Sequence, residues 1–151
     1  IEDQLHIPFK RLEVKSGDFL ILGTNLNSSV EHNIEFISAP NLHWPDTIFS
    51  YDHGTNVLFT CDAFGLHYCS EEFFDTDQKE IYSDFRFYYD CLMGPNARSV
   101  LQAIKRIDKL PKLKTIAVGH GPLLHYQVNF WKEKYLEWSS NKSKGNEFVS
   151  V

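Results

Sequence analysis

The stretch NLHWPDTIFSYDHGTNVLFTCDAFGLHYC, residues Asn41 to Cys69, decides how the rest of the chain is organised. Two short apolar runs, Thr47–Tyr51 and Val57–Cys61, are separated by the sequence Asp-His-Gly-Thr at residues 52–55. An aspartate and a glycine between two such runs are typical of a hairpin turn. The stretch therefore predicts a β-hairpin, and what precedes and follows it must lie at the same end of a sheet.

Three residues of metal-binding type lie at the predicted strand ends. His43 precedes the hairpin, Asp62 directly follows it, and His120 follows a later apolar run, Thr115–Val118. Loops raised on a rigid sheet are a common place for a ligand set, so the three residues could share one site. Each also has an ordinary explanation. His43 could cap Asp46 or stack on its neighbouring tryptophan, Asp62 could be a turn residue, and His120 could stand in its glycine-flanked turn by chance.

Composition excludes several classes of function. The chain has 151 residues, enough for one domain or less, and a net charge of −5, which argues against a nucleic-acid contact surface. No apolar run approaches the roughly 20 residues of a membrane-spanning helix. The three cysteines lack metal-binding spacing and are interpreted as reduced thiols. No nucleophile signature and no phosphate-binding glycine motif is present.

Periodicity predicts strands first and helices afterwards, which favours helices layered on a mainly antiparallel or mixed sheet. Gly94-Pro95 should end the first helix and Asn96 should cap the second. The aromatic residues of the helices, Tyr88 among them, are assigned to the core. The expected strands besides the hairpin are Phe9–Val14, Phe19–Leu22, Ile34–Ala39 and Thr115–Val118, and the expected helices are Lys79–Met93, Ala97–Asp108 and Gln127–Trp138.

Three motifs in the same order resemble those of the flavodiiron proteins. They are Leu42-His43-Trp44-Pro45-Asp46-Thr47, Thr60-Cys61-Asp62-Ala63-Phe64-Gly65 and Gly119-His120-Gly121-Pro122. The resemblance runs over nearly the whole chain. It implies an α/β fold of α+β layers, the metallo-β-lactamase-like αββα sandwich, of which residues 1–138 would be the C-terminal half. Residues 139–146 would be a linker, and residues 147–151 would begin a flavodoxin-like domain, so we expect a longer protein.

The resemblance also implies a ligand set. His43 looks like a terminal ligand to one iron, Asp62 like the carboxylate that bridges two irons, and His120 like a terminal ligand to the other iron. The family's remaining ligands lie in an HxExDH motif that this chain does not contain. We expect that motif upstream of Ile1, and we expect residues 1–151 alone to be inactive.

Activity, cofactors and partners are implied in the same way. The family reduces O2 to water, or NO to N2O, with electrons that reach the two irons from FMN in the adjoining domain. The amino-acid sequence of the motifs is more similar to that of the oxygen-reducing photosynthetic branch, in which NAD(P)H is the electron donor. That branch implies the chloroplast stroma or the cyanobacterial cytoplasm. It also implies a head-to-tail homo- or hetero-oligomer, with no nucleic acid and no membrane span.

Two alternatives from other classes remain open. A zinc-dependent hydrolase of the same metallo-β-lactamase fold would use zinc-bound water as its nucleophile. A non-catalytic subunit of a flavodiiron hetero-oligomer would carry an incomplete ligand set. An upstream HxExDH motif would indicate the diiron enzyme, whereas HxHxDH would indicate the hydrolase.

Overall fold

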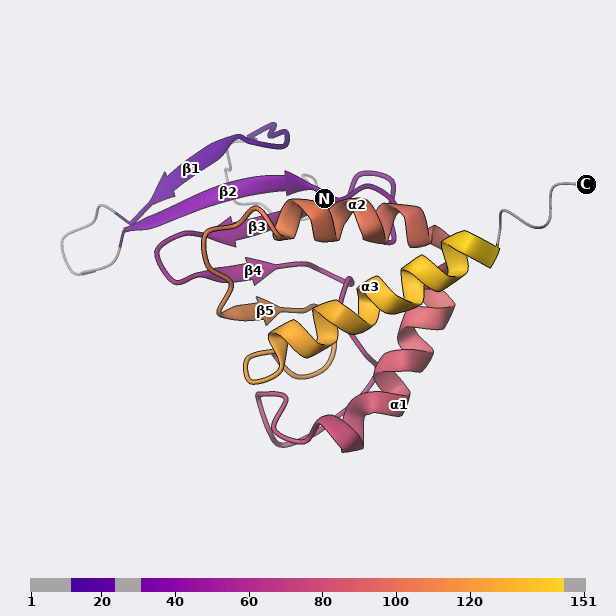
Figure 1. The fold of residues 1–151 in the computed structure, drawn as a ribbon. Coiled ribbons are helices and arrows are strands. Elements are labelled where there is room, and N and C mark those ends of the chain that lie inside the picture. The colour runs from indigo at the N-terminus through magenta and orange to yellow at the C-terminus, as the bar shows by residue number, and fades with distance from the viewer. Residues whose placement is uncertain (1–11, 24–30, 146–151) are drawn as a thin grey trace, which may run out of the picture.

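The computed structural model describes residues 12–23 and 31–145, and within them five strands form one sheet (Figure 1). The strands are β1 (Phe19–Leu22), β2 (His32–Ser38), β3 (Ile48–Asp52), β4 (Val57–Phe59) and β5 (Thr115–Ala117), and they lie side by side in that order. The first four pair antiparallel, and β5 joins β4 in parallel. The predicted hairpin and the predicted mixed sheet are both confirmed.

The strand expected at Phe9–Val14 is not found in residues 12–14, the part of it that the structure describes. Residues 9–11 lie outside the described residues, and Leu12 to Val14 have no strand structure. The strand at Phe19–Leu22 matches the prediction, and the others differ by one or two residues at their ends, as element boundaries commonly do.

The first two helices are joined without the predicted break. Helix α1 (Gln78–Tyr88) continues through a π-helical turn (Tyr89–Met93) and a 3₁₀ turn (Gly94–Asn96) into α2 (Ala97–Ile107). Proline fits the first turn of a helix because its missing N–H has no partner there anyway. Asn96 occupies the N-cap position of α2, as predicted, but its side chain makes no capping hydrogen bond.

Helix α3 (Val128–Gly145) runs past the predicted end at Trp138 into the segment that the composition assigned to a linker. Ser139 is fully buried and its hydroxyl pairs with that of Tyr89 at 2.7 Å. One turn later, Lys142 forms an ion pair with Asp90 at 2.9 Å. Contacts with the π-helical turn therefore keep these polar residues helical, which composition could not indicate. The length of α3 does not test the predicted division into domains, which stays a prediction.

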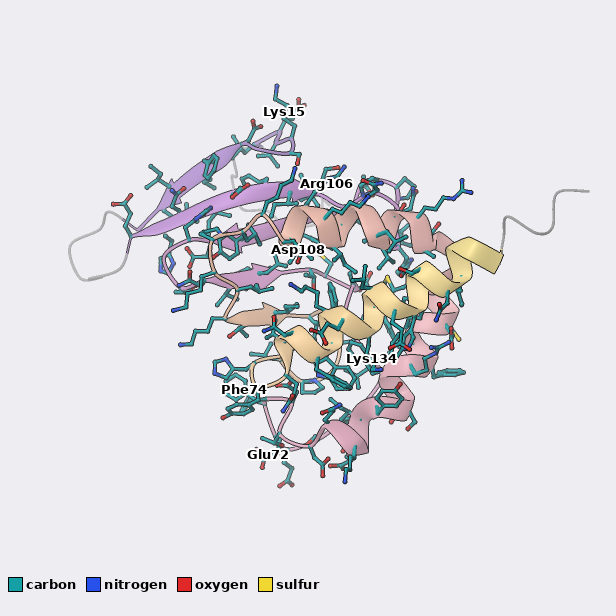
Figure 2. The ribbon with its side chains drawn as sticks, in the orientation of Figure 1. Lys15, Glu72, Phe74, Arg106, Asp108 and Lys134 are labelled. Atoms are coloured by element: carbon teal, nitrogen blue, oxygen red, sulfur yellow. The ribbon has the colours of Figure 1, made fainter. Side chains whose placement is uncertain are left out.

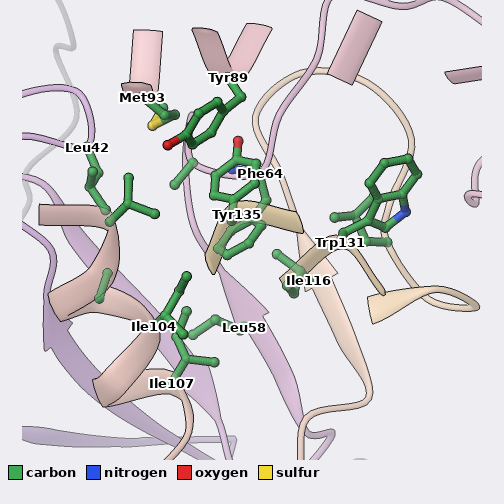
Figure 3. Close-up of a cluster of buried hydrophobic side chains, with 14 of the residues drawn as sticks. Leu42, Leu58, Phe64, Tyr89, Met93, Ile104, Ile107, Ile116, Trp131 and Tyr135 are labelled. Atoms are coloured by element: carbon green, nitrogen blue, oxygen red, sulfur yellow. The ribbon is translucent and has the colours of Figure 1, made fainter. Parts of the chain in front are cut away.

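Helices α2 and α3 lie over one face of the sheet (Figure 1). The sheet's contribution to the resulting core is Ile37, Phe49, Tyr51, Leu58 and Ile116, each at most 4% exposed. Figure 3 shows Leu58 and Ile116 facing Ile104 and Ile107 of α2 and Tyr135 of α3. The register places those five sheet residues on a common face, because cross-strand partners point to the same side. Arg106 adds a polar tie from α2 to the sheet by donating to the backbone carbonyl of Ser38 (Figure 2).

A buried carboxylate fixes the start of α3. Asp75 is 1% exposed and accepts hydrogen bonds from the backbone N–H groups of residues 125, 126 and 127, at 2.7 to 3.0 Å. It also accepts one from the indole of Trp131 at 3.1 Å. The first N–H groups of a helix lack partners within the helix, and a negative charge is favoured there. Asp75 therefore caps α3 from a loop some 50 residues earlier in the sequence.

Candidate metal centre

The three candidate ligands stand on loops at one end of the sheet. The His43 loop leads into β3, the Asp62 loop follows β4, and the His120 loop follows β5. Because β3 runs antiparallel to β4 and β5 runs parallel to it, these three points meet at the same end. The predicted hairpin brings the first two loops together, and the parallel pairing of β5 with β4 adds the third.

The loop that carries His43 is closed by backbone hydrogen bonds. The N–H of Ala39 donates to the carbonyl of Thr47 at 2.9 Å, and the N–H of Asn41 donates to the carbonyl of Trp44 at 2.8 Å. Asn41 has a φ of 64°, in the left-handed region that asparagine tolerates better than most residues. Leu42, at 2% exposed, anchors the loop in the core. The ring of His43 also lies 5.2 Å from that of Trp44, with the ring planes tilted by 37°, so the two rings are in contact without being stacked.

The Asp62 loop is a tight turn that packs against helix α3. Cys61 and Phe64 have φ values of 52° and 66°, which is uncommon for residues other than glycine and indicates a conformation imposed by its surroundings. The hydroxyl of Thr60 donates to the carbonyl of Ala63 at 2.6 Å. The N–H of Phe64 donates to the hydroxyl of Tyr135 at 3.0 Å, and their rings stack with centroids 4.3 Å apart. Helix α3 thereby supports the turn that carries the carboxylate.

Backbone hydrogen bonds also join the Asp62 and His120 loops. The N–H of Gly119 donates to the carbonyl of Cys61 at 2.6 Å, and the N–H of Leu66 donates to the carbonyl of His120 at 3.1 Å. A Cβ atom on Gly119 would lie 3.2 Å from the Cys61 carbonyl oxygen and 3.5 Å from Oδ1 of Asp62. The close approach of the two loops therefore depends on a residue without a side chain.

Asp62 lies between the two histidines and presents a different oxygen to each. Nε2 of His43 is 3.2 Å from Oδ2, and Nε2 of His120 is 3.4 Å from Oδ1. The exposed fractions of the side chains are 30% for His43, 23% for Asp62 and 51% for His120. The structure thus brings all three predicted residues together, at a part of the surface that is open to solvent.

The donor atoms do not surround one point. Within residues 12–23 and 31–145, no group of three or more His, Cys, Asp or Glu side chains could hold a single metal ion. Instead, each oxygen of the shared carboxylate faces a different imidazole. Imidazole and carboxylate are suitable ligands for iron, and the donor set fits two metal positions bridged by Asp62. One histidine and a shared carboxylate are too few ligands for either position, so further ligands are needed from elsewhere. The role of the three residues as ligands stays a prediction.

Two further side chains, His67 and Tyr88, are neighbours of this site. The exposed ring of His67 lies edge-on to those of His120 and Tyr88, with centroids 5.4 and 5.0 Å away. Tyr88 is in the core, as predicted, at 3% exposed, but burial and secondly the charge of Asp62 raise its pKa to about 12. Both side chains line a pocket of about 160 Å³ with Asp84, Phe87, Cys91 and Leu92. The helical period identified Tyr88 as buried, but no local signal could show that it lies beside Asp62.

Comparison with known proteins identifies the class. Residues 10–121 match the family model described as ODP family β-lactamase, so the chain belongs to that family. It is 56% identical over 151 residues to a putative diflavin flavoprotein A 3 from Nostoc, and 53% identical over 151 residues to diflavin flavoprotein A 1 from Synechocystis. Each alignment covers all of this chain and 25% of the relative, so the chain spans about a quarter of these relatives.

Solved structures agree with the family. A metal-soaked Flv1 flavodiiron core from Synechocystis matches with a TM-score of 0.80 and 31% identity, over 91% of this chain and 32% of that one. The rubredoxin oxygen:oxidoreductase from Desulfovibrio gigas matches with a TM-score of 0.77 and 26% identity, over 92% and 34%. The resemblance to flavodiiron proteins and the partial metallo-β-lactamase-like fold are both confirmed. Among the described residues no helix has the length and apolar character needed to cross a membrane.

Proposed function

We propose that this chain is the C-terminal half of the diiron domain of an oxidoreductase that reduces O2 to water, or NO to N2O. The observation that carries the proposal is the position of Asp62, whose two carboxylate oxygens face two different imidazoles. A carboxylate placed in this way can bridge two metals while His43 and His120 each bind one. The flavodiiron relatives support iron as the metal.

The protein's contribution to this chemistry is positioning. The stacked pair of Phe64 and Tyr135 holds the Asp62 turn, and the hydrogen bond from Gly119 to Cys61 sets the distance between the turn and His120. Two bound irons would supply electrons in pairs to a small diatomic substrate. The pocket beside His120, lined by Phe87, Tyr88 and Leu92 among others, is large enough for such a molecule.

The openness of the site supports an electron donor that docks onto it. His120 is half exposed, and Trp44 and Phe87 stand at its rim with exposed fractions of 63% and 68%. We propose that the whole protein binds FMN in a flavodoxin-like domain after this one and takes electrons from NAD(P)H. A head-to-tail oligomer would bring the flavin of one subunit to the irons of another. The cyanobacterial relatives support the cyanobacterial cytoplasm or, in a plant or alga, the chloroplast stroma.

The test is the iron content and O2 consumption of the full-length protein with the substitution Asp62→Ala. Loss of a shared ligand weakens both metal positions, so we expect a greater loss of iron than in His43→Ala or His120→Ala. Asp46→Ala removes an exposed carboxylate from the same region and is the matched control, with normal iron and turnover expected. Two tightly bound irons and normal O2 reduction in Asp62→Ala would refute the bridging role. Zinc in place of iron, with hydrolysis of an ester or lactam, would favour the hydrolase.

A further inference from the structure

A groove lies between the turn before β1 and the C-terminal end of α2. It has a volume of about 290 Å³, and its lining residues are Ser16, Gly17, Glu35, Ile37, Arg106, Lys109 and Leu110. Ile37, at 4% exposed, belongs to the core, so the groove reaches down to apolar side chains. Neither the proposed metal centre nor the proposed flavin domain gives this groove a role.

Two of the residues that line the groove, Arg106 and Lys109, are basic, although the whole chain has a net charge of −5. Five of the chain's 15 basic residues fall within ten positions, at Lys105, Arg106, Lys109, Lys112 and Lys114. The one acidic residue among them, Asp108, is paired with Lys132 at 2.7 Å, and Glu35 inside the groove is paired with His53 at 2.8 Å. With Glu35 paired, the lining offers the positive charge of Arg106 and Lys109, and the other three lysines lie near it in sequence. Part of this charge is explained by the favourable position of cations at a helix C-terminus, but Lys112 and Lys114 lie beyond α2.

An acidic loop with an exposed aromatic side chain stands at the opposite end of the molecule. It consists of Glu71, Glu72 and Phe73, and Phe73 is 80% exposed. Figure 2 shows Glu72 and Phe74 at one end and Lys15 and Arg106 at the other. The backbone of the loop is held in place, because the N–H of Leu123 donates to the carbonyl of Phe73 at 2.8 Å and the N–H of Glu72 donates to Oγ of Ser70 at 3.0 Å. A preformed loop loses less conformational entropy on binding than a flexible one.

We propose that the basic groove binds the Glu71–Phe73 loop of a second copy of this chain. The aromatic ring would enter the groove over Ile37 and Leu110, and the two glutamates would meet Arg106 and Lys109. An aromatic anchor inside a charged, solvated rim is the usual composition of a protein–protein contact. Loop and groove lie at opposite ends of the molecule, so the contact joins two different surfaces, and each copy can contribute one of each. A single phosphate is a poorer occupant, since the cations are spread along the segment and a carboxylate lies in the groove.

Photo-crosslinking of the full-length protein tests the contact directly. Benzoylphenylalanine replaces Phe73, and unlabelled protein is mixed with uniformly ¹⁵N-labelled protein before irradiation. We expect crosslinked peptides that join one labelled and one unlabelled copy, with the second peptide drawn from residues 16–17 or 106–110. The same probe at Phe87, which is 68% exposed but belongs to the other pocket, is the control and should not reach those residues. Crosslinks from position 73 that are absent, or that map elsewhere on the second copy, would overturn the proposal.

Charge exchange tests why the two surfaces bind. Glu72→Lys in the copy with the probe, or Lys109→Glu in the other copy, should each lower the crosslink yield several-fold, and the two together should restore it. Lys79→Glu changes an exposed lysine on α1 and should leave the yield unchanged. Yield should also fall with increasing salt concentration, because the charges are exposed. If neither single charge change lowers the crosslink yield, or if the two changes together do not restore it, charge complementarity does not form this contact.

Discussion

The two faces of the sheet differ more than any other two regions of the molecule. On the covered face, Phe49, Tyr51 and Leu58 are fully buried beneath α2 and α3. On the other face no described element packs, and Phe59 of β4 is 47% exposed. That face is nonetheless apolar, since the register assigns to it Leu20, Leu22, Ile34, Phe36, Ile48, Val57 and Phe59. A soluble protein rarely leaves so many neighbouring apolar side chains in contact with water.

The same incompleteness is found at the proposed metal centre. Three side chains cannot complete the coordination of two metals, just as one layer of helices cannot cover both faces of a sheet. In an αββα sandwich, a second sheet packs on the bare face and its loops extend to the same end. One missing half of the domain would therefore supply both the packing and the remaining ligands. The predictions below separate what residues 12–145 do by themselves from what requires that half.

The largest expected effect is on residues 1–151 expressed alone. We expect no O2 reduction and at most weak, substoichiometric binding of ferrous iron, because metal affinity depends on a preformed ligand set. The bare face should also bind a dye that reports exposed apolar surface. Iron content, O2 uptake and dye fluorescence are compared with those of the full-length protein. Two tightly bound irons per chain with turnover would show that the second half is dispensable.

Two phenylalanines on neighbouring strands compare the faces directly. Phe49→Ala removes a fully buried ring and should lower the free energy of unfolding by about 3–5 kcal/mol. Phe59→Ala removes a half-exposed ring and should cost about 1 kcal/mol or less in residues 1–151. Urea unfolding measures both. In the full-length protein the cost of Phe59→Ala should rise towards that of Phe49→Ala, and an unchanged difference would contradict the sandwich.

Substitution of two capping aspartates compares the buried cap of α3 with the exposed cap of α1. Asp75→Ala leaves three backbone N–H groups and an indole N–H without their acceptor, and should cost about 3 kcal/mol. Asp77→Ala removes bonds to the N–H groups of Lys79 and Glu80 at an exposed position, and should cost about 1 kcal/mol. Thermal unfolding of the two variants ranks them. Equal costs would mean that the α3 cap is not what holds this helix over the sheet.

The smallest expected effect is the pH dependence at Asp52, a buried residue of the bare face. Burial alone would raise its pKa, but hydrogen bonds from Thr55, His32 and the N–H of Gly54 outweigh burial and hold the pKa below the usual value. A lowered folded-state pKa stabilises the protein above the unfolded-state pKa, and this stabilisation is lost as the pH falls through the folded-state value. Asp52→Asn should cost about 1 kcal/mol at neutral pH and reduce the loss of stability between neutral and acidic pH. Acid titration followed by circular dichroism measures both, and an unchanged acid transition would exclude Asp52 as a contributor.

Much of this protein was determined by sequence patterns that act over short distances. The hairpin at residues 47–61 follows from two apolar runs around a turn, and the strand Thr115–Ala117 from a short apolar run before a glycine. The buried stripe Ile81, Phe85 and Tyr88 follows from helical periodicity. The common position of His43 and Asp62 could be predicted because an antiparallel hairpin returns its two flanking loops to the same end of a sheet; the parallel pairing of β5 with β4, which adds His120, had no local signal. Each of these inferences depends on a local period or turn, which the amino-acid order contains directly.

What only the tertiary structure decided are the contacts between distant segments. Ser139 to Gly145 are polar, yet they extend α3 because Tyr89 and Asp90 bind Ser139 and Lys142. Gly94-Pro95 continues a helical path instead of ending it, and Asp75 caps a helix that begins 53 residues later. The proximity of Tyr88 to Asp62 likewise has no local signature. The physical reason is common to all of these: a hydrogen bond or ion pair between residues far apart in sequence can outweigh a propensity of a few tenths of a kcal/mol per residue.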